Sequence, residues 1–359
     1  MDSLTQAVLG AGLQGAVLGR FQGRKALLYG AALATLPDLD VVISYADPVS
    51  SMTFHRGFSH SVFVLSALAA VLTWLIRKRW PDAGYSSARL FLALWLVLVT
   101  HPLLDAFTSY GTQLFWPLAL TPSSWSSLFI IDPGFTLPLL LAVVLAAIGG
   151  AQSRLWQTLT WALGWCLLYL CFSMAGKGLA EHRVRQALRE QGVQVQQVFS
   201  SPMPFNTLLW RVVARDGDHY YEAVSGWFDR AAPETVRQPF NDTLARALID
   251  SPQYNRLSWF TDGWLRHDAI GDELVVSDLR MGMTGYYTFR FLMARRVDGQ
   301  WQAVLPQRWP SSRGGEAELR QIGRRVLGQS PALPLADWSV RNTAARSAPP
   351  DDDLTGQSK

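Results

Sequence analysis

The stretch LFLALWLVLVTHPLLD, residues 90–105, contains no Asp, Glu, Lys or Arg before its final residue, Asp105. A second uncharged run covers residues 137–148. Runs of this kind are typical of helices that cross a membrane. The alternative, buried helices of a large soluble protein, is less favoured because a soluble fold does not need so many uncharged residues in a row.

The first half of the chain contains six apolar segments, at residues 6–19, 26–43, 61–76, 90–107, 133–150 and 155–175. Several are shorter than the roughly 20 residues that an ideal membrane-spanning helix needs. The first segment is rich in glycine, so it either packs closely against a neighbouring helix or crosses only partly. We therefore expect an all-α polytopic membrane domain with about six helical segments over residues 1–178.

The composition changes in the second half, where acidic and basic residues occur throughout and the first glutamate, Glu181, appears. We expect a small α+β soluble domain over residues 179–343 and a disordered tail over 344–359. A hairpin turn is predicted at residues 215–218, which read Arg-Asp-Gly-Asp. The other predicted elements are helices at 178–191 and 233–250 and strands at 208–214, 219–228, 274–278 and 286–295.

Basic side chains lie between alternate apolar segments. They are Arg20, Arg24 and Lys25 after the first segment, Arg77, Lys78, Arg79 and Arg89 after the third, and Arg154 after the fifth. The positive-inside rule makes these three loops cytoplasmic, so the other loops and the soluble domain are expected on the extracytoplasmic face. The net charge of +4 arises partly from these basic clusters. Because the clusters indicate the orientation of the chain in the membrane, we do not interpret them as nucleic-acid-binding patches, and no direct nucleic-acid binding is expected.

His101 and Asp105 are four residues apart, so they share one face of a helix. They could bind one metal ion, or the carboxylate could orient the imidazole. A His–Asp pair buried for packing is an equal alternative when the two residues are taken alone. Pro102 lies between them and predicts a local break in the helix.

His55 and His60 enclose Arg56 and Ser59 immediately before the third segment. Two histidines this close are candidate ligands, and Arg56 is a candidate for binding a phosphate or carboxylate. The alternative is a helix cap by Ser59 with histidines at the membrane interface.

Asp38 and Asp40 close the second segment behind Pro37 and are candidate oxygen ligands, although a polar stop to a hydrophobic helix is the better explanation for these residues taken alone.

Together the His and Asp side chains are expected on one face of the membrane, where ionisable groups are costly and tend to be functional. This set suits one or two divalent ions with an open position for water. Zinc is the favoured ion, with manganese and magnesium as alternatives.

The predicted metal ligands are Asp38, Asp40, His55, His60, His101 and Asp105, and the predicted catalytic residues are His101, Asp105 and Arg56. No cysteine accompanies these motifs, which argues against a closed structural zinc site. Because the first half contains no glutamate before Glu181, a general base would have to be Asp or His.

These motifs resemble those of the YdjM-like family, whose members are named LexA-binding, inner-membrane-associated hydrolases and are often labelled metal-dependent hydrolases. The resemblance rests on residues 1–6 (MDSLTQ), 36–40 (LPDLD), 55–61 (HRGFSHS), 100–105 (THPLLD), 110–112 (YGT), 131–133 (IDP) and 202–206 (PMPFN). It implies a multi-pass protein of the bacterial inner membrane with a metal-dependent hydrolase activity. The order of these motifs is also similar to that of zinc-dependent phospholipase C proteins, which points towards phosphodiester or phospholipid cleavage.

Three functions stay open on the sequence alone. The leading one is a membrane-bound metal-dependent hydrolase acting on a phosphorylated or lipid-like substrate. A regulatory or scaffolding protein, which the LexA-binding name suggests, would need a cytoplasmic surface for its partner. A proton-coupled transporter is the third, since His–Asp pairs within membranes also serve transport. Membrane lipid is the expected partner, and the aromatic-rich second half offers a surface for a protein partner.

The predicted orientation can be tested with reporters fused after Lys359. Alkaline phosphatase, which folds only outside the cytoplasm, should be active there, because the three basic loops hold the opposite ends of the segments in the cytoplasm. The same enzyme fused after Arg79 should be inactive. An inactive phosphatase after Lys359, with a fluorescent cytoplasmic reporter at the same position, would contradict this topology and favour the scaffolding function.

Overall fold

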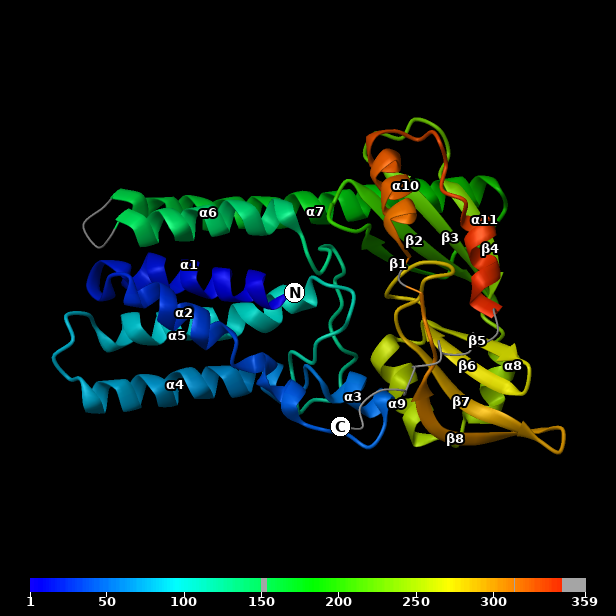
Figure 1. The fold of residues 1–359 in the computed structure, drawn as a ribbon, viewed down its shortest axis with the longest axis horizontal. Coiled ribbons are helices and arrows are strands. Elements are labelled where there is room, and N and C mark those ends of the chain that lie inside the picture. Colours follow the sequence, from blue (N-terminus) through cyan, green and yellow to red (C-terminus); the bar gives the residue numbers. More distant parts are fainter. Residues whose placement is uncertain (150–153, 313, 344–359) are drawn as a thin grey trace, which may run out of the picture.

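The computed structural model describes residues 1–149, 154–312 and 314–343. Its first part is a bundle of helices that lie side by side, and its second part contains two antiparallel sheets (Figure 1). The bundle consists of α1 (Ser3–Gln22), α2 (Lys25–Ala34), α4 (Val62–Arg79), α5 (Ser87–Ala106), α6 (Pro133–Gly149) and α7 (Gln157–Glu190). The short helix α3 (Pro48–Phe54) lies at the end of the bundle nearest the sheets. The expected helical character of the first half is confirmed.

Two of these helices, α5 and α7, are long and apolar enough to cross a membrane. A third candidate arises if the bent pair Pro48–His60 and Val62–Arg79, whose axes differ by 44°, is counted as one span. The apolar helices α2 and α6 have only 10 and 17 residues. The described residues therefore provide two or three candidate spans, although all six apolar segments contain helix.

Helices α1 and α2 pack closely through glycine. A Cβ atom on Gly10 would lie 2.4 Å from the carbonyl oxygen of Gly30, and one on Gly30 would lie 2.2 Å from the carbonyl oxygen of Gly10. Only glycine permits this approach, so the glycine-rich first segment does pack closely against a neighbour. Asp2 caps α1 by accepting a hydrogen bond from the amide of Thr5 at 3.0 Å.

The second apolar segment, expected over residues 26–43, is not one helix. Helix α2 ends at Ala34, and Pro37 opens a tight 3-10 turn, η1 (Pro37–Val42). Pro37 has no amide hydrogen to donate to the carbonyl oxygen of Leu33, which explains why α2 does not continue as a regular helix. Asp38 and Asp40 therefore lie on a turn that folds back across the end of the bundle.

The break expected at Pro102 is wrong, because α5 continues through this residue to Ala106. The turn is buried, and Gln6 Nε2 donates a hydrogen bond to the carbonyl oxygen of His101 at 3.2 Å, so neighbouring groups support the backbone there. The helix expected to begin at Gly178 is the second half of α7, which passes through that residue without interruption. The proposed domain boundary at 178 falls within this helix and stays a prediction.

The second part of the chain contains two four-stranded sheets. Strands β1 (Gln197–Pro202), β2 (Leu209–Asp216), β3 (His219–Gly226) and β4 (Glu234–Pro239) form the first, and β5 (Leu265–Ile270), β6 (Glu273–Asp278), β7 (Arg290–Val297) and β8 (Gln300–Arg308) form the second. The helices are α8 (Asp242–Ala245), α9 (Pro252–Thr261), α10 (Glu316–Leu327) and α11 (Leu335–Ser339). We call this part, which follows α7, the sheet domain.

The strands predicted at 208–214, 219–228, 274–278 and 286–295 correspond to β2, β3, β6 and β7, although β7 begins later, at Arg290. The predicted hairpin turn joins β2 to β3, with Asp216 opposite His219. The helix predicted over 233–250 is confirmed only in its second part, where α8 and the 3-10 turn η4 (Arg246–Leu248) lie, because Glu234–Pro239 pairs with β3 as strand β4. Pairing with a neighbouring strand outweighs local helix preference here. The predicted tail, 344–359, lies outside the described residues.

Two packing contacts hold the sheet domain against the bundle. Helix α7 contributes side chains to the bundle core near its start and packs others, including Val184 and Leu188, on β2 and β3. Helix α3 packs Val49 and Met52 into the same core as Leu257 and Phe260 of the sheet domain. The sheet domain is therefore fixed beside the end of the bundle at which the N-terminus lies (Figure 1).

Candidate metal centre

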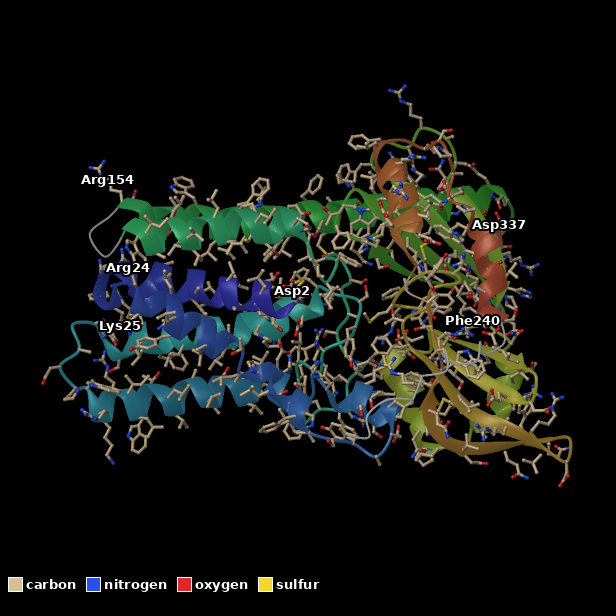
Figure 2. The ribbon with its side chains drawn as sticks, in the orientation of Figure 1. Asp2, Arg24, Lys25, Arg154, Phe240 and Asp337 are labelled. Carbon is tan, nitrogen blue, oxygen red and sulfur yellow. The ribbon has the colours of Figure 1, made fainter. Side chains whose placement is uncertain are left out.

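The polar motifs gather at one end of the bundle and the basic loops at the other. Figure 2 shows Arg24, Lys25 and Arg154 at the end away from the sheet domain, and Asp2 at the end beside it. The candidate ligands come from η1, from the end of α3, where His55 lies, from the short turn η2 (Phe58–His60) and from the last turns of α5. The gathering expected from the loop charges is therefore present in the fold.

Four side chains converge at this end: Asp38, His60, His101 and Asp105. One ligand atom from each lies within 4.8 Å of all the others. His60 Nε2 lies 3.4 Å from Asp38 Oδ1 and 3.3 Å from Asp105 Oδ2. His101 Nε2 lies 3.4 Å and 3.5 Å from the same two oxygens. Two nitrogens and two oxygens therefore surround one point, and we call these four residues the ligand group.

Four of the six separations in the ligand group, those between a histidine nitrogen and a carboxylate oxygen, match the spacing in a tetrahedral metal site. Ligand atoms bound at about 2.0–2.1 Å with tetrahedral angles lie about 3.3–3.4 Å apart. Three of the atoms, His60 Nε2, His101 Nε2 and Asp105 Oδ2, are buried and have no hydrogen-bond partner among the described residues. Buried polar atoms of this kind are costly unless something binds them, and a cation would satisfy all three. The donor set suits zinc, and its oxygens also suit manganese or magnesium.

Hydrogen bonds on the outer side of each imidazole leave the inner nitrogen free to bind an ion. His101 Nδ1 lies 2.7 Å from the carbonyl oxygen of Ala34, which can only accept, so Nδ1 carries the proton. Ser59 Oγ donates to Asp40 Oδ2 at 2.6 Å and lies 2.9 Å from His60 Nδ1, from which it accepts. In both rings Nε2 therefore keeps its lone pair and faces the centre.

Asp105 is fully buried, and its two oxygens have different surroundings. Oδ1 accepts hydrogen bonds from Gln6 Nε2 at 3.2 Å and from the α-amino group of Met1, and it lies 3.3 Å from the Arg56 guanidinium. These donors fix the carboxylate so that Oδ2 faces the two histidines. Gln6 and Met1 were missed as site residues, because neither belongs to a ligand pattern, and the resemblance over residues 1–6 was the only signal for them.

Asp40 and His55 form a pair beside the ligand group. His55 Nδ1 lies 2.8 Å from Asp40 Oδ1, and Asp40 Oδ2 accepts the backbone amide of Arg56 at 3.1 Å. The buried Arg56 guanidinium donates to Thr108 Oγ1 at 3.3 Å and lies 4.9 Å from the centre of the Tyr110 ring. Burial also raises the pKa of the Tyr110 hydroxyl. The six predicted ligands are thus arranged as a group of four and an adjoining pair.

The ligand group is open on the side of Asp38. The Asp38 side chain is 26% exposed, whereas those of His60, His101 and Asp105 are at most 1% exposed. His55, whose side chain is 23% exposed, lines a neighbouring cavity of about 550 Å³ together with Asp40. A small molecule would therefore approach the group from the side of Asp38 and His55.

The chain is similar in sequence to a protein family and to proteins of two bacteria. Residues 1–180, half of the 359-residue chain, match the family described as YdjM inner membrane protein. YfhP of Bacillus subtilis (strain 168), described as an uncharacterized protein, is 27% identical over 318 residues, which cover 80% of this chain and 89% of YfhP. The inner membrane protein YbcI of Escherichia coli (strain K12) is 36% identical over 91 residues, 25% of this chain and 51% of YbcI. No solved structure matches the chain.

The ligand group predicts tight binding of zinc to the purified protein. His60→Ala and His101→Ala each remove a ligand and should lower zinc affinity by more than about 100-fold, and Ser59→Ala, which removes an orienting contact, should lower it by about 10–100-fold. Competition with a chromogenic chelator measures these affinities. His182→Ala is the matched control, because this exposed histidine of α7 is distant in sequence from the motifs and should leave zinc binding unchanged. Equal affinities in all four variants would contradict the site.

Proposed function

The chain belongs to the YdjM inner membrane protein family, and we propose that it is a membrane-bound metal-dependent hydrolase acting on a phosphorylated or lipid-like substrate. One observation carries the proposal: the ligand atoms of Asp38, His60, His101 and Asp105 converge, and those of the last three are buried without a hydrogen-bond partner in the described part of the chain. Four protein ligands fill a tetrahedral site, so a divalent ion held there would supply Lewis-acid chemistry and would activate water as a nucleophile by taking it as a fifth ligand.

His55 is the candidate general base. Its Nδ1 lies 2.8 Å from the Asp40 carboxylate, which fixes the tautomer with the proton on Nδ1 and leaves the lone pair of Nε2 available to accept a proton. His55 is partly exposed and lines the 550 Å³ cavity, whereas His60 and His101 are buried in the ligand group. These properties suit a group that takes a proton from water and returns it to a leaving group.

Arg56 has a positioning role in this proposal. Its guanidinium lies 3.3 Å from Asp105 Oδ1, and the residue is 5% exposed, so it holds the carboxylate from the side opposite the histidines. The buried positive charge also favours negative charge that develops on a substrate phosphate near the centre. The sequence suggested that Arg56 binds an anion. We propose that Arg56 attracts a bound anion through its positive charge and that it holds Asp105 in place.

The proposal is tested with zinc-loaded protein and two probes, a p-nitrophenyl phosphodiester and a short-chain fluorogenic phospholipid. Asp105→Asn should lower kcat by about 100-fold or more, because it weakens a ligand. His55→Asn should lower kcat by about 10²–10⁴-fold with zinc content unchanged, because it removes the base and no member of the ligand group.

The control is again His182→Ala, for which wild-type turnover is expected. Wild-type turnover no faster than that of Asp105→Asn, or turnover unchanged after zinc is stripped with a chelator, would contradict the proposed function.

A further inference from the structure

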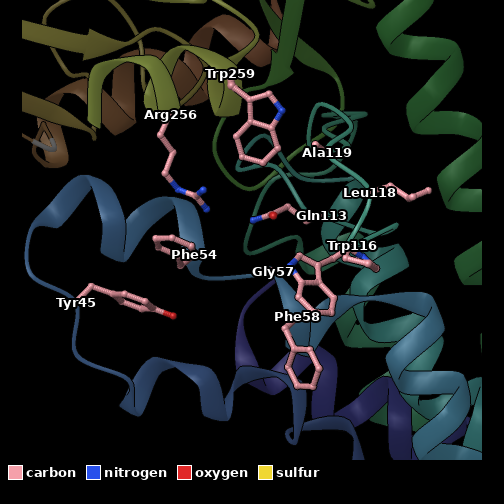
Figure 3. A pocket seen from close by; sticks show the side chains of 11 residues that line it. Tyr45, Phe54, Gly57, Phe58, Gln113, Trp116, Leu118, Ala119, Arg256 and Trp259 are labelled. Atoms are coloured by element: carbon pink, nitrogen blue, oxygen red, sulfur yellow. The ribbon is translucent and has the colours of Figure 1, made fainter. Parts of the chain in front are cut away.

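Two neighbouring cavities lie where the bundle meets the sheet domain. The first, of about 550 Å³, includes Asp40, His55 and Arg308 in its wall. The second, of about 600 Å³, has a largely aromatic wall formed by side chains from both parts of the chain (Figure 3). Tyr45 lines both cavities, and its ring stacks on that of Phe54 with centroids 5.1 Å apart. The stacked pair therefore lies at the boundary between the two cavities.

The first cavity connects the His55–Asp40 pair with a cation from the sheet domain. Arg308, the last residue of β8, lies with its guanidinium 4.7 Å from the centre of the Phe289 ring and donates to the carbonyl oxygen of Thr288 at 3.4 Å. A guanidinium offers five N–H donors in a planar fork that matches the geometry of a phosphate. The negative charge of Asp40 is partly compensated, because its oxygens accept hydrogen bonds from neighbouring groups. The cavity is therefore suited to an anionic group.

The second cavity is suited to an apolar chain. Phe54, Phe58 and Trp116 from the first half of the chain and Trp259 from α9 surround it (Figure 3). Aromatic rings of this size provide a large apolar contact area at low entropic cost. Because Trp259 belongs to the sheet domain, the cavity is completed only when the two parts of the chain are packed together.

The rim of the second cavity joins an apolar surface. Phe58 is 59% exposed and Leu118 is 55% exposed, and both line the cavity. The guanidinium of Arg256 lies 3.6 Å from the centre of the Phe54 ring and donates to Thr53 Oγ1 at 2.6 Å, so it fixes α9 to α3 at the edge of the cavity. Exposed apolar side chains at the end of a membrane bundle favour entry from the lipid phase.

We propose that the two cavities form one site for a membrane phospholipid, with the phosphate beside Arg308 and His55 and an acyl chain between Phe58, Trp116 and Trp259. The inference rests on the proposed function and names the substrate class of the same site. The cation selects an anionic headgroup, and the aromatic wall selects an apolar tail. Inorganic phosphate has no acyl chain for the aromatic wall, and a neutral lipid has no negative charge for Arg308, so a ligand with both parts should bind much more tightly than either.

The test measures binding, with zinc removed by chelator, of three probes to the full chain in detergent: dihexanoyl phosphatidic acid, dihexanoylglycerol and inorganic phosphate. The phosphatidic acid should bind at least about tenfold more tightly than either other probe. Arg308→Gln and Phe58→Ala should each weaken its binding by about tenfold. Both side chains are exposed, so neither change should unfold the protein, and thermal unfolding checks this.

Two matched controls accompany the variants. Arg295→Gln removes an exposed arginine of β7, and Phe63→Ala removes an exposed phenylalanine of α4 that does not line the cavity; neither should change binding by more than about twofold. Equal binding of phosphate and phosphatidic acid, or binding unaffected by Arg308→Gln and Phe58→Ala, would overturn the inference. Zinc binding and phosphodiester turnover are measured separately. If zinc binding and turnover are intact but the lipid does not bind, only the lipid site is overturned. If the lipid binds but there is no turnover, only the proposed hydrolase function is overturned.

Discussion

The buried carboxylate of Asp105 is the constraint on which the rest of the site depends. A charge at this depth is strongly unfavourable unless other groups compensate it. Arg56, Gln6 and the α-amino group of Met1 satisfy one oxygen, and the other faces His60 and His101. The start of α1, the turn before α4 and the end of α5 must therefore meet at this point.

The packing of the sheet domain determines what can reach this centre. Helix α7 passes without interruption from the bundle core to the first sheet, and α3 shares a core with α9. The continuous helix α7 fixes the direction in which the sheet domain leaves the bundle. The packing of α3 on α9 fixes the sheet domain beside the ligand group. Arg308 and Trp259 can line cavities next to His55 and Phe58 only because both contacts are present. The sheet domain is thus part of the site that we propose.

Much of the site could be predicted from the sequence. The spacing of His101 and Asp105 follows from the helical repeat, and the alternation of basic loops is enough to bring the other motifs to the same end of the bundle. The sequence could not predict that His55 and His60 belong to different parts of the site, because both residues precede the same helix. Arg56, between them, adopts a left-handed backbone conformation with φ of 61°, and His55 pairs with Asp40 while His60 joins the ligand group.

Other features depend on tertiary contacts that a single sequence does not reveal. Gln6 is the polar first residue of an apolar segment in the sequence, and only the packing of α1 on α5 brings it to Asp105. Residues 234–239, predicted as the start of a helix, form β4 because the edge of β3 is available for pairing, and the helix α8 begins only at Asp242. Pro102 predicts a break, yet the surrounding side chains support an unbroken helix.

X-ray absorption at the zinc edge of the purified protein tests the central claim most directly, because it reports the ligands of the ion. We predict one bound zinc with four or five nitrogen and oxygen ligands at about 2.0–2.1 Å and the outer scattering of two imidazole rings. A sulfur atom in the shell, a single imidazole or none, or the absence of bound zinc after loading would contradict it.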